Sequence, residues 1–204
     1  DGYNVAVGFE AGLTMTTGVR NTIMGGLAGD ALTTGGYNIA IGYSALGTED
    51  TGAKSVAIGY AALGLQNYNG DAYNIAIGYS TGSEITTGTA NTLIGGLTGD
   101  ALTEGANNVL LGYDAGGSLT TGSENVAIGS YALKTENVNG FNVAIGYSAL
   151  EALDAGDNGY NVAIGYKAGE AMSTGVNNTI MGGLAGDALT TGSGSVALGY
   201  NALG

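Results

Sequence analysis

The chain has 204 residues, including 41 glycines, 17 acidic residues and only four basic ones, and its formal net charge is −13. This charge excludes nucleic-acid binding and docking on anionic membranes, because both need clustered cations. The absence of histidine and cysteine excludes disulfides, thiolate metal sites and nucleophilic triads. Glycine or a polar residue interrupts every apolar run, so we expect no membrane insertion.

The first predicted element, a short strand, recurs along the whole chain. The pattern Asn-Val-Ala-Ile-Gly occurs in twelve related copies, spaced by 17 residues except for two intervals of 19. We call its glycine the motif glycine and number the other positions of each repeat from it. The motif glycines are Gly8, Gly25, Gly42, Gly59, Gly78, Gly95, Gly112, Gly129, Gly146, Gly165, Gly182 and Gly199.

Position −3 is β-branched in all twelve copies, and position −1 is Val, Ile, Leu or Met. Residues two apart lie on one face of a strand, so the pattern predicts a strand whose −3 and −1 side chains form its buried face. The segment Thr-Thr-Gly follows, and its glycines (Gly18, Gly35, Gly88, Gly122 and Gly192) fit left-handed turn positions. Strand, turn, second short strand and turn then make one coil, and stacked coils predict an all-β parallel solenoid.

Asparagine occupies position −4 in ten copies and serine in the other two, Ser55 and Ser195. Stacked in register, the amide side chains are expected to bond one another in a ladder along the solenoid. The ladder residues are Asn4, Asn21, Asn38, Asn74, Asn91, Asn108, Asn125, Asn142, Asn161 and Asn178.

Two exchanges between positions indicate a closely packed interior. Seven copies have glycine at position +4 and Leu, Ile or Met at +7, whereas the other five have leucine at +4. Copies with an aromatic residue at +1 usually have alanine at −2, which suggests that the ring covers the alanine. This aromatic row is a candidate for packing or for binding sugars, and it comprises Phe9, Tyr43, Tyr60, Tyr79, Tyr113, Tyr147, Tyr166 and Tyr200.

The two 19-residue intervals add residues in the linkers 67–72 and 154–159. The chain also matches itself at a shift of 87 residues, as Tyr73-Asn74 and Tyr160-Asn161 show. We therefore expect both linkers to bulge from the same edge, five coils apart.

The run Asn-Val-Ala-Ile-Gly-Tyr-Ser-Ala-Leu resembles the head repeats of YadA-like trimeric autotransporter adhesins, and similar runs occur in repetitive phage tail fibres. The resemblance covers the whole chain. It implies a left-handed parallel β-roll, three chains side by side, and a place on a bacterial surface or a virion. It also implies that Val143, Ile145 and their equivalents line the roll. The head repeats of the adhesins are shorter and lack the regular tyrosine.

Few residues suggest chemistry. Asp154 and Asp157 could form a carboxylate pair for sugar hydrolysis, but they stand in a glycine-rich linker, so the ordinary interpretation is a solvated loop. Gly-Gly-Leu-Ala-Gly-Asp resembles calcium-binding repeats, which makes Asp30, Asp100 and Asp187 weak calcium candidates; the sequence otherwise indicates no cofactor. The adjacent pair Thr16-Thr17 does not fit an ice-binding face, because a strand would send its hydroxyls to opposite sides.

We therefore expect one solenoid domain over residues 1–204, of twelve coils of 17–19 residues, cut from a longer fibrous protein. The expected function is a non-enzymatic, extracellular shaft that pairs with itself as a homotrimer or longer fibre. Cell-surface glycan is a possible partner through parts outside this segment. Two alternatives stay open: an adhesion module that binds glycan or ice along one face, and a subunit of a self-assembling filament.

Overall fold

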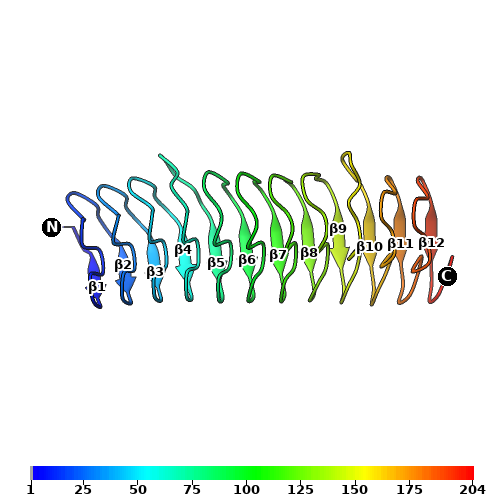
Figure 1. The fold of residues 1–204 in the computed structure, drawn as a ribbon, viewed down its shortest axis with the longest axis horizontal. Coiled ribbons are helices and arrows are strands. Elements are labelled where there is room, and N and C mark those ends of the chain that lie inside the picture. The colour runs from blue at the N-terminus through cyan, green and yellow to red at the C-terminus, as the bar shows by residue number, and fades with distance from the viewer. Residues whose placement is uncertain (1) are drawn as a thin grey trace.

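The computed structural model describes residues 2–204 and shows a straight rod (Figure 1). The chain winds into stacked coils, each contributing one three-residue strand to a single parallel sheet in sequence order, with the two termini at opposite ends. The strands are β1 (Val5–Val7), β2 (Thr22–Met24), β3 (Ile39–Ile41), β4 (Val56–Ile58), β5 (Ile75–Ile77), β6 (Thr92–Ile94), β7 (Val109–Leu111), β8 (Val126–Ile128), β9 (Val143–Ile145), β10 (Val162–Ile164), β11 (Thr179–Met181) and β12 (Val196–Leu198).

Equivalent residues stack in register. Val126 pairs with Val109 on one side and with Val143 on the other. The 19-residue coils keep the same register, since Val143 pairs with Val162. Their extra residues leave the rod as two longer loops on the same edge, above β4–β5 and β9–β10 in Figure 1. The prediction of a parallel β-solenoid is confirmed.

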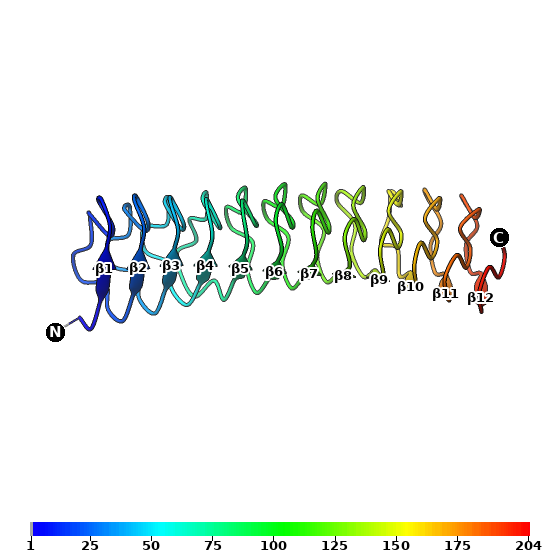
Figure 2. The same cartoon turned by 90° about the horizontal axis from the view of Figure 1, so that it is seen from below.

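The expected second strand is wrong. Within residues 2–204 the strands are β1 to β12 alone, and the rest of each coil consists of turns and bends, seen as crossing loops in Figure 2. Successive Thr-Thr-Gly segments still bond one another: the amide of Thr16 donates to the carbonyl of Thr33 (2.9 Å), and that of Thr33 to Asp50 (2.8 Å). The chain turns again after these contacts, so no run of extended residues is long enough to form a ladder.

The predicted buried face is also wrong. In β9 the middle residue, Ala144, is fully buried, while Val143 and Ile145 are only half-buried and point outward. The same alternation holds from β2 to β12. The coil is narrow: position −2 shares the interior with alanine at +3, such as Ala149, and one or two larger side chains such as Leu150. In each strand from β2 to β12 the residue at −2 therefore faces inward, and the residues at −3 and −1 face outward.

The packing inside the coil, rather than the aromatic residue at +1, explains why position −2 is alanine in some coils and isoleucine or leucine in others. A Cβ atom on Gly29 would lie 3.3 Å from Cδ1 of Ile23, and one on Gly99 would lie 3.0 Å from Cδ1 of Leu110 in the next coil. A large side chain at −2 thus fills the space above a glycine at +4. Each coil with leucine at +4 has alanine at −2. The rule also covers Ala127, which stands beside Ser130 rather than an aromatic residue.

The glycines serve two different needs. The motif glycines have φ between 119° and 144°, as at Gly8 (138°), a region that residues with a Cβ atom rarely enter. The Thr-Thr-Gly glycines lack a positive φ, so the predicted left-handed turn there is wrong. A Cβ atom on Gly18 would instead lie 2.5 Å from the carbonyl oxygen of Gly35. Close approach of the next coil therefore requires that glycine.

Candidate interaction surface

The outward face of the sheet carries most of the exposed large apolar side chains of residues 2–204. Exposed and buried residues alternate across it, so positions −5, −3, −1 and +1 face out while −4 and −2 face in. In the coil of β3 the outward residues are Tyr37, Ile39, Ile41 and Tyr43, and the inward ones are Asn38 and Ala40. The inward pair belongs to the amide ladder and to the core, which leaves the outer four for a partner.

This face carries no charge between its edges. None of the residues at positions −3, −1 and +1 is charged in any of the twelve coils, although the chain has a net charge of −13. The −3 and −1 residues are Val, Ile, Leu or Met apart from three threonines, Thr22, Thr92 and Thr179. Several of these side chains are well exposed, such as Met24 (42%) and Ile94 (39%), and a continuous row of exposed apolar side chains is typical of an interaction surface.

An aromatic row borders the face at position +1, and its rings are about half-exposed, from 46% at Tyr147 to 79% at Tyr200. Neighbouring rings stack along the rod, with centroids 5.5 Å apart for Tyr43–Tyr60 and 5.2 Å apart for Tyr60–Tyr79. Tyr147 stacks on Tyr166 in the same way (5.7 Å), whereas Tyr113 meets Tyr131 edge to face. All eight residues of the predicted row, from Phe9 to Tyr200, lie on this border.

A second aromatic row borders the opposite edge at position −5. The sequence analysis did not predict this row. Its members are Tyr3, Tyr37, Tyr73, Phe141 and Tyr160. Phe141 stacks on Tyr160 with ring centroids 4.9 Å apart, and the cations of the same column, Arg20 and Lys54, lie over Tyr37 and Tyr73. The signal in the sequence was the aromatic residue directly before the ladder asparagine.

The ladder of asparagines runs beneath this edge. Oδ1 of Asn21 accepts the backbone amide of Asn38 in the next coil (2.9 Å), and Nδ2 of Asn38 donates to the carbonyl of Gly52 (2.9 Å). Five neighbouring pairs also bond side chain to side chain, such as Asn108 to Asn91 (3.1 Å). Within residues 2–204 every buried side-chain nitrogen and oxygen has a hydrogen-bond partner. The ladder thus couples successive coils, except between Ser55 and Asn74, where Gln66 bonds both side chains instead.

Two glutamates are buried inside the rod, at position +7 of the coils of β3 and β8. Oε1 of Glu136 accepts the backbone amides of Asn137 (3.1 Å) and Asn139 (3.3 Å), and Oε2 accepts that of Ala155 (3.4 Å) in the long linker. Burial raises the pKa of Glu136, and these hydrogen bonds partly oppose it. Glu49 likewise accepts the amide of Tyr68 in the other linker (3.2 Å). Each glutamate therefore anchors a 19-residue coil.

The calcium candidates do not come together. Asp30, Asp100 and Asp187 lie in the coils of β2, β6 and β11, several coils apart. Burial, and then the charge of Asp114, raise the pKa of Asp100. In the part of the chain that the structure describes, no group of three or more acidic, histidine or cysteine side chains could hold a metal ion.

The other polar candidates are on loops or are engaged by the backbone. Asp154 and Asp157 are exposed in the long linker, where Asp157 accepts the amide of Asn158 (2.7 Å). The hydroxyl of Thr16 donates to the carbonyl of Thr33 (3.1 Å), and Thr86 and Thr103 bond the next coil in the same way. These hydroxyls connect coils and are not free to order ice.

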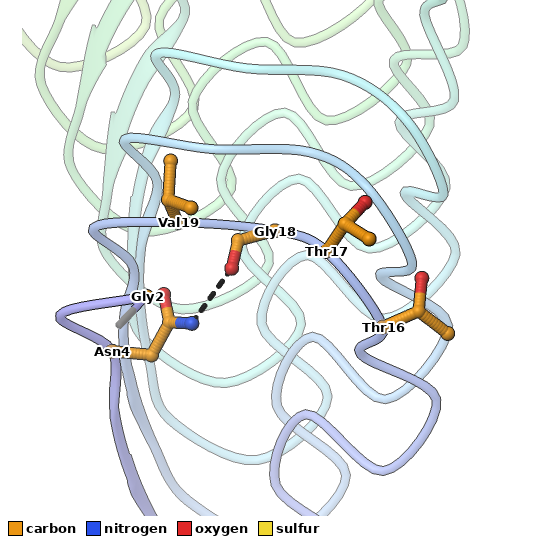
Figure 3. A pocket seen from close by; sticks show the side chains of 6 residues that line it. All are labelled: Gly2, Asn4, Thr16, Thr17, Gly18 and Val19. Carbon is orange, nitrogen blue, oxygen red and sulfur yellow. Dashed lines mark hydrogen bonds between the residues drawn. The ribbon is translucent and has the colours of Figure 1, made fainter.

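Hollows in the surface are shallow. One, of about 260 Å³, opens at the end of the first coil, where Nδ2 of Asn4 donates to the carbonyl of Gly18 and Thr16 and Thr17 lie across the coil (Figure 3). It is the end of the solenoid interior. A second, of about 360 Å³, lies along the coils of β3 to β5 and is lined by serines, Thr48, Leu65 and Glu84. Neither hollow gathers several charged groups.

Comparison with known proteins gives no relative for this chain: no family model, no curated protein and no solved structure matches it. Among residues 2–204 there is also no helix that could cross a membrane. Function is therefore argued from the outward face itself.

Proposed function

We propose that the chain is a non-enzymatic shaft segment of an extracellular or virion fibre, in which three copies lie side by side with their outward sheet faces turned to one another. The observation that carries this proposal is the uncharged apolar face. Copies that each carry a charge of −13 repel one another, so they associate best through a surface whose −3, −1 and +1 positions have no carboxylate in any coil.

The size of the face also supports self-association. A specific interface buries about 800 Å² on each partner, which the exposed Val and Ile columns and their aromatic borders can supply. The resemblance to the head repeats of trimeric adhesins supports three copies and a surface or virion location. A rod of stacked coils, each bonded to the next by sheet and amide ladder, is stiff and suits a spacer.

The test compares the native mass of the chain with that of two single-lysine variants. Ile128→Lys places a charge in the middle of the outward face. Thr121→Lys is the matched control, because Thr121 is exposed and equivalent to Thr17, across the coil from the strand in Figure 3. We expect a trimer for the unmodified chain and for Thr121→Lys, and a monomer for Ile128→Lys. A monomeric unmodified chain at micromolar concentration would refute the proposal.

A further inference from the structure

The two aromatic borders of the outward face are correlated coil by coil. Each of the five coils with an aromatic residue at −5 also has one at +1. The pairs are Tyr3 with Phe9, Tyr37 with Tyr43, Tyr73 with Tyr79, Phe141 with Tyr147, and Tyr160 with Tyr166. Where +1 is glycine or serine, −5 is never aromatic: Arg20 with Gly26, Ala90 with Gly96, Glu124 with Ser130, and Asn177 with Gly183.

Contacts within one chain do not require this correlation. Positions −5 and +1 are six residues apart and stand on either side of the three-residue strand, so their Cα atoms are separated by up to roughly 20 Å. The ring contacts run along each border instead, as for Tyr43 with Tyr60 and Phe141 with Tyr160. A single partner that spans both borders at the same height would couple them.

The glycines at +1 leave notches in the face. A Cβ atom on Gly96 would have only Tyr113 nearby, at 3.7 Å. Beside the notches the −1 side chains are uncovered: Met24, Ile94 and Met181 are 42%, 39% and 38% exposed. In the coils from β3 to β10 that have tyrosine at +1, the −1 residues are less exposed than these three side chains. The notches therefore recur at β2, β6 and β11.

We propose that the copies run parallel and in register, with the −5 border of one copy against the +1 border of the next. This arrangement rests on the proposed self-association and defines its geometry. In nine of the twelve coils aromatic residues then meet aromatic residues, or smaller or polar −5 residues meet a glycine or serine at +1. In the other three coils, Lys54, Asn107 and Gly194 lie against Tyr60, Tyr113 and Tyr200. Arg20 of one copy meets the notch at Gly26 of the next, beside the ring of Tyr43, where a cation–π contact can form. Such unlike-border contacts close into a ring.

The shape and chemistry of the borders favour this register over a shifted one. A shift by one coil would place the −5 ring of Tyr37 opposite the notch at Gly26 or beside Tyr60, and would bring Glu124 against Tyr113 or Tyr147. A two-fold antiparallel pairing would bring each border against itself. That arrangement would not explain why every coil with an aromatic residue at −5 also has one at +1.

Disulfide crosslinking tests the register, because the chain contains no cysteine. The matched variant combines Glu124→Cys with Ser130→Cys, which share one coil. Within one chain these two positions are too far apart to be bridged, since a disulfide needs Cα atoms within about 7 Å. The offset control combines Ser130→Cys with Asn177→Cys, three coils further along. Each single-cysteine variant serves as a second control.

We expect oxidation to convert most of the matched variant into covalent trimers on a non-reducing gel, and to leave the offset and single variants uncrosslinked. Equal crosslinking of the offset variant, or crosslinking of a single variant to itself, would overturn the in-register arrangement. A native trimer in which the matched pair does not link would overturn it as well. A monomeric native mass in the same sample would instead refute the proposed function, so the two failures are distinguishable.

Discussion

Nε2 of Gln66 donates a hydrogen bond of 2.9 Å to Oε2 of Glu49, the residue directly beneath it in the previous coil, and both side chains are fully buried. The same amide nitrogen also donates to Oγ of Ser55, and Oε1 of Gln66 accepts from Nδ2 of Asn74. Gln66 therefore connects the buried carboxylate to the amide ladder at the place where serine interrupts it.

This network makes Gln66→Leu destabilising. The substitution leaves a buried carboxylate oxygen and the side-chain amide of Asn74 each with one partner fewer, and we expect a loss of about 2–3 kcal/mol in the free energy of unfolding. Urea denaturation monitored by circular dichroism measures it. Glu49→Leu alone should also be destabilising, because the backbone amides of Gly52 and Tyr68 lose their acceptor. Since Glu49 and Gln66 share a hydrogen bond, the loss in the double variant Glu49→Leu/Gln66→Leu should be smaller than the sum of the two single losses. Strict additivity would contradict the network.

The raised pKa of Glu136 predicts a dependence of stability on pH. The ordinary value is 4.5, and burial holds the pKa of the folded state above it. The folded chain thus binds this proton more readily than the unfolded chain. The stabilisation from the protonated Glu136 is therefore fully present at pH values below 4.5 and is lost as the pH rises through the pKa of the folded state. Glu136→Gln should gain stability relative to the unmodified chain between pH 4 and pH 7. Glu84→Gln, which removes an exposed carboxylate, is the control.

The repeat made the fold predictable, because the period alone requires that equivalent residues stack. It did not decide which face of the strand lies inside. Val143 and Ile145 are more hydrophobic than Ala144, and the usual rule would bury them. The rule failed because a coil of 17 residues encloses little space, so that of the three strand residues only the one at −2 lies inside.

The interior was predicted only in part. The exchange between positions +4 and +7 was visible in the sequence, since both columns supply large side chains. The exchange between −2 and +4 was assigned to tyrosine instead, because the residue at +1 is next to the strand in the chain. Contacts such as that of Gly99 with Leu110 cross from one coil to the next. Without knowing how the coils stack, a reader of the sequence has no basis for choosing that neighbour.

The motif glycine should be the least tolerant position of each coil. At Gly112, φ is 131° and a Cβ atom would lie 2.6 Å from the carbonyl carbon of Gly129, so Gly112→Ala combines backbone strain with a clash against backbone. We expect a loss of at least about 3 kcal/mol. Gly96→Ala is the matched control, since its Cβ would have ordinary contact and its φ is not positive. Hydrogen exchange in the coils around β7 should rise for Gly112→Ala and stay unchanged for Gly96→Ala.

The exchange between −2 and +4 predicts that one type of coil can be converted into the other. In the coil of β9 the pair is Ala144 and Leu150, whereas in the coil of β7 it is Leu110 and Gly116. Gly116→Leu alone overfills the interior, since even a Cβ atom there would lie 2.8 Å from Cδ1 of Leu110, and it should cost about 1–3 kcal/mol. Leu110→Ala alone leaves a cavity and should cost more.

The double variant Leu110→Ala/Gly116→Leu reproduces the pair found in the coil of β9, and Leu119 already occupies position +7 of the changed coil as Leu153 does in that of β9. We expect the double variant to lose about 2 kcal/mol less free energy of unfolding than the sum of the two single losses, a coupling of the size that contacting residues show. Urea denaturation of all four chains measures the cycle. Strict additivity would mean that these two side chains do not share one space, and the structural account of the core would then be wrong.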